Sequence, residues 1–481
     1  MQKLKWCDPL DLAYQISISD YQKNWIFLYS GLNKTIKNSK SYLGLYPIKE
    51  IISDGFDELE NTLQNQQNKW PKWFGYFSYN LKNQLENLTI DQKSLINLPN
   101  LWMINFGLVL EFDHDSKTIF VHQNQSQKIE EFLSHYNIQS FNRNQKLRLP
   151  LKGGVTRCNL GSNFSKSAYL QKVKTIQKYI ADGKIYQANL TRKFFGKFTT
   201  KPQNSFEIFL KLNAESPANY SSFLKLGEHH IISSSPELFL KIDPHNNIPE
   251  LLESDKICSG ISAPNKRGVG ATARKNKEDI TKSTGLCYVL SSPIKGTAKK
   301  FRDKKLDENS KRILQNSAKE KAENLMIVDL VRNDISKHCL SGSVQVKNMF
   351  KISSYKTLHH LSSDICGIKK PSASNLDVIK SCFPAGSMTG APKIKAMEIC
   401  SELEKQERGI YSGAIGFVDQ NSCELSVVIR TLIIKDNQFE FQVGGAITFD
   451  SEPQQEWQET INKAKGIAKT LGIKLTELKK I

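Results

Sequence analysis

The chain has 481 residues, of which 39% are hydrophobic and 24% are charged, and its formal net charge is +19. These proportions are normal for a soluble globular protein. The nine cysteines are scattered without a C-x-x-C pair, which argues against a zinc site or a disulfide framework and favours a reducing cytosol. Because the sequence contains no apolar run of about eighteen residues and no charged-then-apolar leader, we expect a cytoplasmic protein without a membrane span or secretory signal.

The lysines that produce the positive charge are spread along the chain among many asparagines and glutamines. The sequence shows no zinc finger, no basic region followed by heptads and no ribonucleoprotein motif with interleaved aromatic residues. We therefore attribute the charge to a general lysine bias and expect no nucleic-acid partner. An anionic small substrate would benefit from the same charge.

Residues 1–155 are predicted to form an irregular α/β region. Strands are expected at 24–31 and 102–112, which are rich in aromatic and branched residues. The polar stretch 137–165 is typical of a linker. The chain is therefore expected to divide into an N-terminal region and a second domain over 156–481.

The second domain is predicted to open with a helix in "SKSAYLQKVKTIQKYIADGK", which Gly183 ends before a strand that begins near Ile185. One face of this helix carries Tyr169, Val173, Ile176 and Ile180. Residues 244–290 have little periodicity and many polar or glycine residues. We interpret them as an inserted surface segment, with a lid over a site as the less favoured alternative.

Periodicity returns after residue 300. Helices are predicted over 315–333, 391–405 and 452–471, and they alternate with strand-like runs such as "YSGAIGFV", "ELSVVIRTLII" and "FEFQVGGAI". Alternating helices and strands with mixed connections predict a large α/β or α+β body.

The first candidate site residue lies in "AKEKAENLMIVDLVRND". Glu323 shares a helix face with Ile327 and Leu330, and the apolar run from Leu325 to Val331 predicts a buried helix. A carboxylate on a buried face must be paired, protonated or bound to a cation. A partner arginine or lysine and a bound cation remain equally open.

The last helix carries two further carboxylates. Ser451 is predicted to cap this helix, on which Glu456 and Glu459 form a row that Lys463 extends. A solvated Glu–Lys pair is the simpler interpretation. If this row faces Glu323, three oxygen ligands converge in a way that suits Mg²⁺.

Other candidates need partners before they indicate a site. In "FPAGSMTGAPKIKAMEIC", Gly386 and Gly390 permit a tight loop before a helix whose free N–H groups would bind a carboxylate or phosphate. Arg430 lies in an apolar run and requires an anion if buried. Glu237, His359 and His360 are each consistent with a structural or a catalytic role. Lys295 in "SSPIKGTAKK" is either a surface lysine or, if it points into a cavity, a nucleophile with a lowered pKa.

Taken together, these runs resemble component I of the chorismate-utilising enzymes, which include anthranilate, aminodeoxychorismate, isochorismate and salicylate synthases. The matching runs are "YQANLTRKF", "SSPELFL", "PIKGT", "AENLMIVDLVRND", "HHLSS", "FPAGSMTGAPKIKAMEI", "GIYSGAIGF", "VVIRTL" and "EPQQEWQET", in the family's order from about residue 160 onward. The runs "FLYSG" and "WFGYFSYNL" are similar to the N-terminal signature of the family. The implied fold is two packed β-sheets with peripheral helices, with the active site between the sheets.

Two positions choose among the members of this family. Gln187 stands where isochorismate and salicylate synthases carry a water-activating lysine, which implies ammonia as the nucleophile. Lys295 stands where anthranilate synthases usually have alanine, as in aminodeoxychorismate synthases. The resemblance implies that Lys295 adds to C2 of chorismate as the 4-hydroxyl leaves, and that ammonia then enters at C4. The alternative is anthranilate synthase component I, which releases pyruvate.

The resemblance also implies roles for the other candidates. Glu237 would donate a proton to the leaving hydroxyl, and His360 would be a second acid or base. Mg²⁺ would be held by Glu323, Glu456 and Glu459, directly or through water. The substrate would be bound by Arg430, Tyr411, Thr389, Lys463, Gly444, Gly445, Ala446, Gln187 and Thr297. Because no cysteine lies in a glutaminase context, ammonia would come from a separate glutamine amidotransferase subunit, component II.

The family often has a tryptophan pocket in its N-terminal region. Ser30, Tyr42, Asn219, Tyr220 and Ser221 align loosely with it. Asn219 replaces a usual proline there, and Ala446 replaces a usual glycine in the substrate site. A hypothesis of a different class is a catalytically weakened basic binding protein, which is suggested by Ala446 and by the insertion before Lys295.

Overall fold

The computed structural model describes residues 2–19, 23–30, 39–65, 72–86, 88, 94–123, 127–136, 158–200, 202–244, 286–355 and 358–480. Within these residues, hydrogen bonds connect twenty strands into one network, and the paired strands are antiparallel throughout. The order of pairing divides the network into two layers.

The first layer consists, in order of pairing, of β4 (Trp73–Phe77), β17 (Ala414–Val418), β18 (Cys423–Val427), β11 (Leu238–Pro244), β12 (Cys287–Ser292) and β15 (Leu358–Ile368). One edge of β15 pairs with β12 and with β13 (Ile294–Lys299), and its other edge pairs with β14 (Gln345–Ser354). This layer therefore brings β13 beside the strand that carries His360.

The second layer consists, in order of pairing, of β2 (Trp25–Tyr29), β9 (Tyr220–Leu226), β10 (His229–Ser235), β19 (Thr431–Lys435), β20 (Gln438–Ile447) and β8 (Gln187–Phe198). The far edge of β8 pairs with β7 (Cys158–Ser162) and β16 (Gly390–Ala391). The long strands β3 (Lys40–Ser53) and β5 (Leu101–Asp113) join the layers, because β3 pairs with β2 and β5 pairs with β4. β6 (Thr118–Gln123) and β1 (Gln2–Lys5) extend from β5.

The two layers pack face to face. One cluster of buried side chains combines Phe74 and Ile415 of the first layer with Leu224 and Ile433 of the second. Burial of such side chains removes apolar surface from water and holds the layers together. The predicted fold class of two packed sheets with peripheral helices is therefore confirmed.

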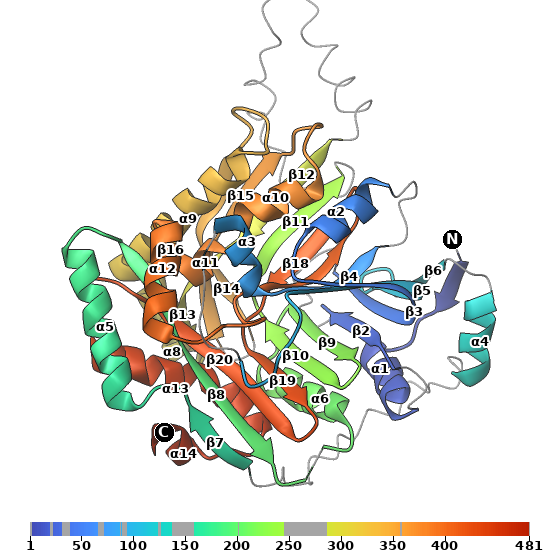
Figure 1. The fold of residues 1–481 in the computed structure, drawn as a ribbon, viewed down its shortest axis with the longest axis horizontal. Coiled ribbons are helices and arrows are strands. Elements are labelled where there is room, and N and C mark those ends of the chain that lie inside the picture. Colours follow the sequence, from blue (N-terminus) through green and yellow to red (C-terminus); the bar gives the residue numbers. More distant parts are fainter. Residues whose placement is uncertain are drawn as a thin grey trace, which may run out of the picture.

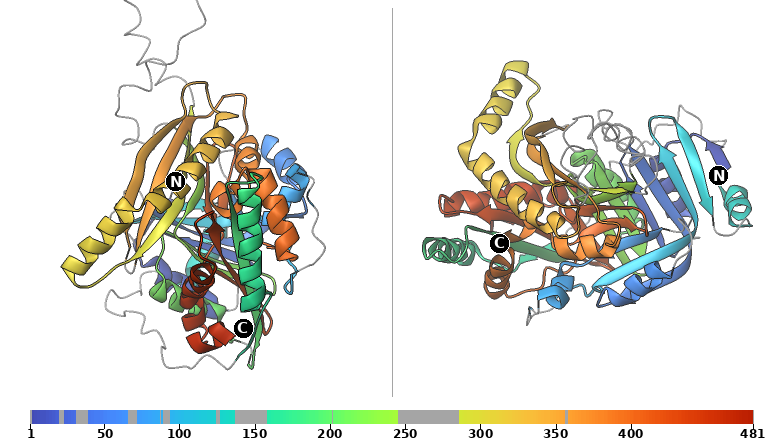
Figure 2. Two further views of the ribbon diagram at one scale, coloured as in Figure 1. Left: turned by 90° about the vertical axis from the view of Figure 1, so that its left-hand side faces the viewer. Right: turned by 90° about the horizontal axis from the view of Figure 1, so that it is seen from above.

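Helices cover the outer face of each layer. The first layer is covered by α2 (Asp57–Gln64), α9 (Ala318–Ser336), α10 (Asn375–Cys382) and α11 (Gly386–Thr389). The second layer is covered by α1 (Pro9–Ile18), α4 (Gln127–His135), α5 (Lys166–Ala181), α6 (Ser205–Glu215), α12 (Lys393–Glu404), α13 (Pro453–Thr470) and α14 (Leu475–Lys480). The remaining helical segments are η1 (Tyr79–Leu81), α3 (Lys82–Glu86) and α8 (Lys304–Asn316). Figure 1 shows α5, α12 and α13 on one side and α1 and α4 on the other, and Figure 2 shows α8 and α9 (yellow) running along the strands of the first layer.

The predicted helices agree with α5, α9, α12 and α13 to within about three residues, which is the usual uncertainty at helix ends. Ser165 caps α5 and Gly183 ends it with φ +70°. The predicted cap of the last helix is wrong, because α13 has Glu452 as its N-cap residue, without a side-chain cap bond. The hydroxyl of Ser451 instead donates to Oε1 of Glu456 at 2.7 Å.

Two further expectations need correction. α9 is not buried all round, because Leu325 is 49% exposed while Ile327 and Val331 face the core. The run "ELSVVIRTLII" is not one strand, because it divides into β18 and β19. Arg430 lies at the break with φ +50°. Both errors arise because apolar composition alone does not determine which side of an element is covered or where a strand turns.

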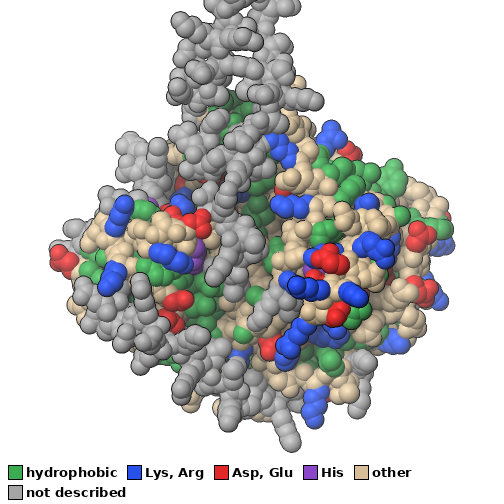
Figure 3. Space-filling view, turned by 180° about the vertical axis from the view of Figure 1, so that it is seen from behind, with side chains coloured by type: hydrophobic (Ala, Val, Ile, Leu, Met, Phe, Trp, Pro, Cys, Tyr) green, Lys and Arg blue, Asp and Glu red, His purple; other side chains and the backbone are tan. Residues whose placement is uncertain are grey.

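The N-terminal region is paired into the same network as the rest of the chain, through β2 with β9 and β4 with β17. The predicted domain boundary at 155/156, most of the predicted linker and residues 245–285 of the predicted insertion lie outside the described residues. Figure 3 shows Lys and Arg side chains interspersed with acidic and neutral ones on one face. Among the described helices, none has the length and apolar character needed to cross a membrane.

Candidate active site

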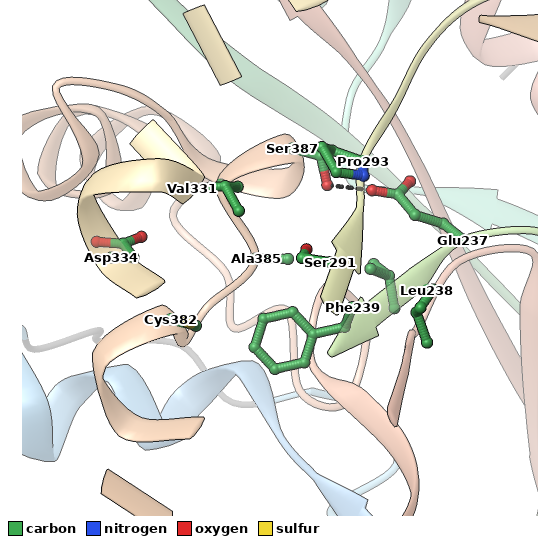
Figure 4. Close-up of a pocket in the computed structure, with 12 residues that line it drawn as sticks. Glu237, Leu238, Phe239, Ser291, Pro293, Val331, Asp334, Cys382, Ala385 and Ser387 are labelled. Atoms are coloured by element: carbon green, nitrogen blue, oxygen red, sulfur yellow. Dashed lines mark hydrogen bonds between the residues drawn. The ribbon is translucent and has the colours of Figure 1, made fainter. Parts of the chain in front are cut away.

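Lys295 and Glu237 meet at Ser387. Nζ of Lys295 donates a hydrogen bond to the backbone carbonyl of Ser387 at 3.0 Å. The hydroxyl of Ser387 donates to Oε1 of Glu237 at 2.5 Å, and Figure 4 shows this contact beside a small cavity. Two predicted reaction groups that are far apart in the sequence therefore share one neighbour.

The pairing of β11 with β12 explains how Glu237 and Lys295 lie close together although a long insertion separates them in the sequence. Leu238, next to Glu237, pairs with Ser292 in the hairpin of β11 and β12. At the far end of the same hairpin, Pro244 pairs with Cys287. The two strand ends that flank the insertion in the sequence are therefore paired with each other, at the end of the hairpin away from Glu237.

The surroundings of Lys295 favour its neutral form. Burial lowers the pKa of Lys295, the carboxylate of Glu323 opposes this shift, and the ammonium group of Lys463 adds to it. A lysine with a lowered pKa supplies more of the uncharged amine that a nucleophile requires. The alternative of an ordinary surface lysine is not supported, because the side chain is half-buried and bonded to Ser387.

Glu237 is a buried carboxyl group that is suited to donate a proton. Its side chain is 4% exposed at the start of β11. Burial raises the pKa of Glu237 to about 6, against the opposing effects of the hydrogen bond from Ser387 and the charge of Lys295. A carboxyl group with such a pKa retains its proton at higher pH than an exposed glutamate does.

His360 connects β13 to Arg430. Its Nδ1 lies 3.1 Å from Oγ1 of Thr297, and its Nε2 lies 3.5 Å from Nη2 of Arg430. Arginine is always a donor, so Nε2 accepts and the ring proton is on Nδ1. Burial lowers the pKa of His360 to about 3, and the charge of Arg430 adds to the shift. The imidazole is therefore neutral, which suits a hydrogen-bonding group better than a cationic acid.

Arg430 is positioned by the backbone. Its left-handed φ of +50° lies in the break between β18 and β19, a conformation that residues other than glycine rarely adopt. None of the ion pairs between described residues involves Arg430. A guanidinium group without a carboxylate partner is suited to bind an anionic ligand.

The three predicted metal ligands lie on α9, which packs against β13 and β15, and on α13, which packs against β20. A side-chain carbon built on Gly445 would lie 3.3 Å from Oε2 of Glu456 and 3.5 Å from Oε1 of Glu459, so both carboxylates face the same point. Nζ of Lys319 lies 3.8 Å from Oε1 of Glu456 and 4.0 Å from Oε1 of Glu323. One ammonium group is therefore near a carboxylate of α9 and a carboxylate of α13.

The carboxylate oxygens of Glu323, Glu456 and Glu459 are donor atoms that suit Mg²⁺, although the three side chains do not converge on one point. Within the described residues, no group of three or more His, Cys, Asp or Glu side chains is arranged to hold a metal ion. Carboxylate oxygens are the donors that Mg²⁺ prefers, and the ion keeps several waters. Burial raises the pKa of Glu323 to about 7, with Lys295 opposing the shift. Lys463 pairs with Glu459 at 2.6 Å and donates to the carbonyl of Gly444 at 2.6 Å.

The other predicted substrate-binding residues lie on the scaffold around these groups. Gln187 pairs with Ala391 at the edge of β8, and its Oε1 is buried without a hydrogen-bond partner among the described residues. Thr389 and Tyr411 are buried, and the hydroxyl of Thr389 donates to the carbonyl of Gly386. Ala446 is half-buried and pairs with Asn189. Gln187 Oε1 is therefore a polar atom for which a ligand would be a suitable partner.

The residues of the predicted tryptophan pocket gather at one end of β2, β3 and β9. Tyr29, the neighbour of Ser30, pairs with Ser221, the neighbour of Tyr220, and Tyr42 pairs with Leu28. Two polar side chains of this region already form hydrogen bonds within the protein. Ser221 donates to Oδ1 of Asn213 at 3.0 Å, and Nδ2 of Asn219 donates to the hydroxyl of Tyr355 at 3.0 Å.

Sequence reasoning missed two residues of this site. Ser387 lies within the glycine loop that was expected to bind an anion, so its position was marked although its role was not. Tyr355 packs edge-on against His360 with ring centroids 5.2 Å apart, and no motif indicated it. Contacts of this kind depend on pairing between distant segments and are not visible in local patterns.

A buried ion pair supports the loop that carries Ser387. Arg408 forms two hydrogen bonds with Glu404, at 2.9 and 2.8 Å. The same guanidinium donates to the carbonyls of Met388 at 2.8 Å and Asn189 at 2.7 Å. It therefore ties α11 and α12 to β8.

Replacing Arg408 by methionine is expected to lower the free energy of unfolding by about 3–5 kcal/mol, because Glu404 is left as an unpaired buried charge. Urea denaturation followed by circular dichroism measures the change. The control is Arg312→Met, which removes an exposed guanidinium on α8 that bonds to Asn309. Equal stability of the two variants would contradict the role given to Arg408.

Comparison with known proteins identifies the family. The sequence profile described as chorismate binding enzyme matches residues 16–250 and 287–469. The chain is 30% identical to anthranilate synthase component 1 of Lactococcus lactis, over 93% of this chain and 94% of that protein. It is 31% identical to aminodeoxychorismate synthase component 1 of Escherichia coli, over 82% and 76%.

A solved structure supports the same assignment. Anthranilate synthase component I of Streptococcus pneumoniae superposes with a TM-score of 0.70 at 25% identity, covering 91% of this chain and 93% of that one. The profile leaves out residues 251–286, which fall within the predicted insertion. The chain belongs to the chorismate-utilising enzyme family.

Proposed function

We propose that this chain is component I of an aminodeoxychorismate synthase, which converts chorismate and ammonia to 4-amino-4-deoxychorismate for p-aminobenzoate and folate synthesis. The observation that carries the proposal is the half-buried amine of Lys295, which has a lowered pKa and shares Ser387 with Glu237. An amine at this position suits the amination at C4 rather than the anthranilate reaction.

In the proposed reaction, the neutral amine of Lys295 forms a bond to C2 of chorismate. The bond from C4 to its hydroxyl group breaks, and Glu237 gives its proton to the departing oxygen, which leaves as water. Ammonia then forms a bond to C4, and the bond between C2 and Lys295 breaks as the amine leaves. Arg430 would hold a substrate carboxylate throughout.

Two further components belong to the proposal. We infer that a glutamine amidotransferase subunit, component II, supplies the ammonia in a heterodimer located in the cytoplasm. Mg²⁺ held by Glu323, Glu456 and Glu459 would neutralise charge on a substrate carboxylate. The donor atoms of these side chains support this assignment.

The test is incubation of the purified chain with chorismate, Mg²⁺ and ammonium, followed by identification of the product by mass spectrometry. Formation of 4-amino-4-deoxychorismate without pyruvate is the expected result. If chorismate is not consumed while nucleic-acid affinity survives moderate salt, the basic binding protein of the sequence analysis replaces this proposal.

A second candidate is anthranilate synthase component I. It is favoured by the Lactococcus lactis relative, which aligns with nearly the whole chain. That reaction places nitrogen at C2 and releases pyruvate, so a lactate dehydrogenase assay distinguishes the two candidates. Pyruvate in amounts equal to the chorismate consumed would select this second candidate.

Arg430→Gln is expected to lower kcat/KM for chorismate by about 30-fold or more, because truncating one partner of a desolvated charge pair is strongly unfavourable. The effect should appear mainly in KM, measured with saturating ammonium and Mg²⁺. Arg332→Gln is the control, since Arg332 is an exposed residue of α9 that pairs with Asp329. An unchanged KM in Arg430→Gln would remove Arg430 from the substrate site.

Chelation with EDTA is expected to stop turnover, and added Mg²⁺ should restore it. Glu456→Gln should raise the Mg²⁺ concentration needed for half-maximal activity by about tenfold or more, since one charged ligand becomes a neutral amide. Glu452→Gln is the control, because Glu452 is an exposed residue at the start of the same helix. Equal Mg²⁺ requirements for both variants would argue against the proposed ligand.

A further inference from the structure

Ser387 bonds to both groups that the proposed reaction uses, through two different atoms. Its hydroxyl bonds to the carboxyl group of Glu237, and its carbonyl accepts from the amine of Lys295. Ser387 and Glu237 are 5% and 4% exposed, so little water competes for these bonds. We propose that Ser387 is a positioning residue that sets the proton affinity of Glu237 and directs the amine of Lys295.

The turn that carries Ser387 is held rigidly at both ends. A side-chain carbon on Gly386 would lie 2.5 Å from Cδ2 of Leu330, so the turn packs closely against this side chain of α9. The carbonyl of Met388 accepts from Arg408, and Gly390 pairs with Ala188 of β8. The hydroxyl and carbonyl of Ser387 are therefore fixed before a substrate arrives, as preorganised catalysis requires.

The hydrogen bond from the hydroxyl of Ser387 affects the protonation of Glu237. A donor to a carboxylate stabilises the ionised form, so it opposes the effect of burial. In the close-up of Figure 4, the hydroxyl group of Ser387 points to the carboxyl group. The other titratable or charged groups that act on Glu237 or line the adjoining cavity are Lys295, Lys463, Arg430, Tyr411, Cys382 and Asp334, and Asp334 is paired with Lys393. The carbonyl of Ser387 that accepts from Lys295 belongs to the backbone and is kept when the side chain is changed.

The proposal rests on the proposed function, since Glu237 and Lys295 take their roles from it. In Ser387→Ala, the limb of the pH profile of kcat/KM that Glu237 controls should move upward by about one pH unit, because ionised Glu237 loses a donor. Turnover at the optimum should fall by about tenfold or more while KM changes little, because the carboxyl group of Glu237 is less well oriented for proton transfer once its bond to the hydroxyl is lost. Ser387→Cys, which keeps a similar size but donates weakly, should shift the limb in the same direction.

Ser387→Thr keeps a hydroxyl group and should return the limb to its wild-type position even if turnover remains lower. Ser381→Ala is the control, because the hydroxyl of Ser381 bonds only to the backbone carbonyls of Asp334 and Val378 and to the thiol of Cys382 among described residues. A purely structural role would lower the thermal stability of the alanine and cysteine variants and leave the limb unmoved. That result would overturn the proposal.

A second measurement does not depend on turnover. The carboxyl stretch of Glu237 can be titrated by infrared difference spectroscopy, with Glu237→Gln identifying the band. Its midpoint should rise by about one pH unit in Ser387→Ala and Ser387→Cys. If the wild-type protein does not aminate chorismate but the midpoint shifts, the proposed function fails and the effect of Ser387 on the proton stands. If the midpoint does not shift, the inference about Ser387 is wrong and the proposed function is unaffected.

Discussion

Lys295→Ala is expected to reduce formation of 4-amino-4-deoxychorismate by about 10³-fold or more, because removing a covalent nucleophile eliminates the step that the other groups assist. Lys463 cannot take over this role, since its ammonium group is paired with Glu459 and bonded to the carbonyl of Gly444. Product analysis by mass spectrometry measures the loss. Some chorismate is expected to be diverted to anthranilate, which pyruvate release would reveal.

Two control variants test whether the effect of Lys295→Ala comes from loss of the amine, from loss of a positive charge or from a change in β13. Lys295→Arg keeps a cation of similar reach but has no neutral amine, so it should be as inactive as the alanine variant. Lys299→Ala removes an exposed lysine at the other end of β13 and should retain wild-type turnover. Wild-type production of the 4-amino compound by Lys295→Ala would disprove the covalent role.

Much of the fold was predictable because its signals are local. The face of α5 with Tyr169, Val173 and Ile176 repeats at helical spacing, and these residues are buried as expected. β5 and β20 coincide with runs of aromatic and branched residues. The order of the strands was not predictable in this way, because pairings such as β2 with β9 join segments that are nearly 200 residues apart.

The candidate site was predicted residue by residue, whereas its connections were not. Glu237 and Lys295 were both named, but the bond that each makes to Ser387 depends on how a four-residue turn packs against two strands. The same holds for His360, whose neutrality results from its burial beside Arg430. Residue types indicate the available chemistry, and the tertiary contacts determine the protonation states.

Glu237→Gln is expected to lower kcat by about 10²- to 10⁴-fold, the usual contribution of a positioned general acid. Glutamine has nearly the same shape and can still accept from Ser387, but it has no acidic proton to give. The control is Glu308→Gln on α8, where the carboxyl group is exposed and pairs with Lys311. Wild-type turnover in Glu237→Gln would assign the proton transfer to another group.

The proton transfer proposed for Glu237 makes kcat/KM depend on pH. Glu237 must be protonated and Lys295 must be neutral, so kcat/KM should follow the fraction of enzyme in which both conditions hold. Burial raises the pKa of Glu237 to about 6 and lowers the pKa of Lys295, and both shifts enlarge that fraction. Glu237→Gln should remove the alkaline limb and leave the acidic one. If the alkaline limb persists in this variant, a group other than Glu237 supplies the proton, and burial of this carboxyl group serves the fold rather than the reaction.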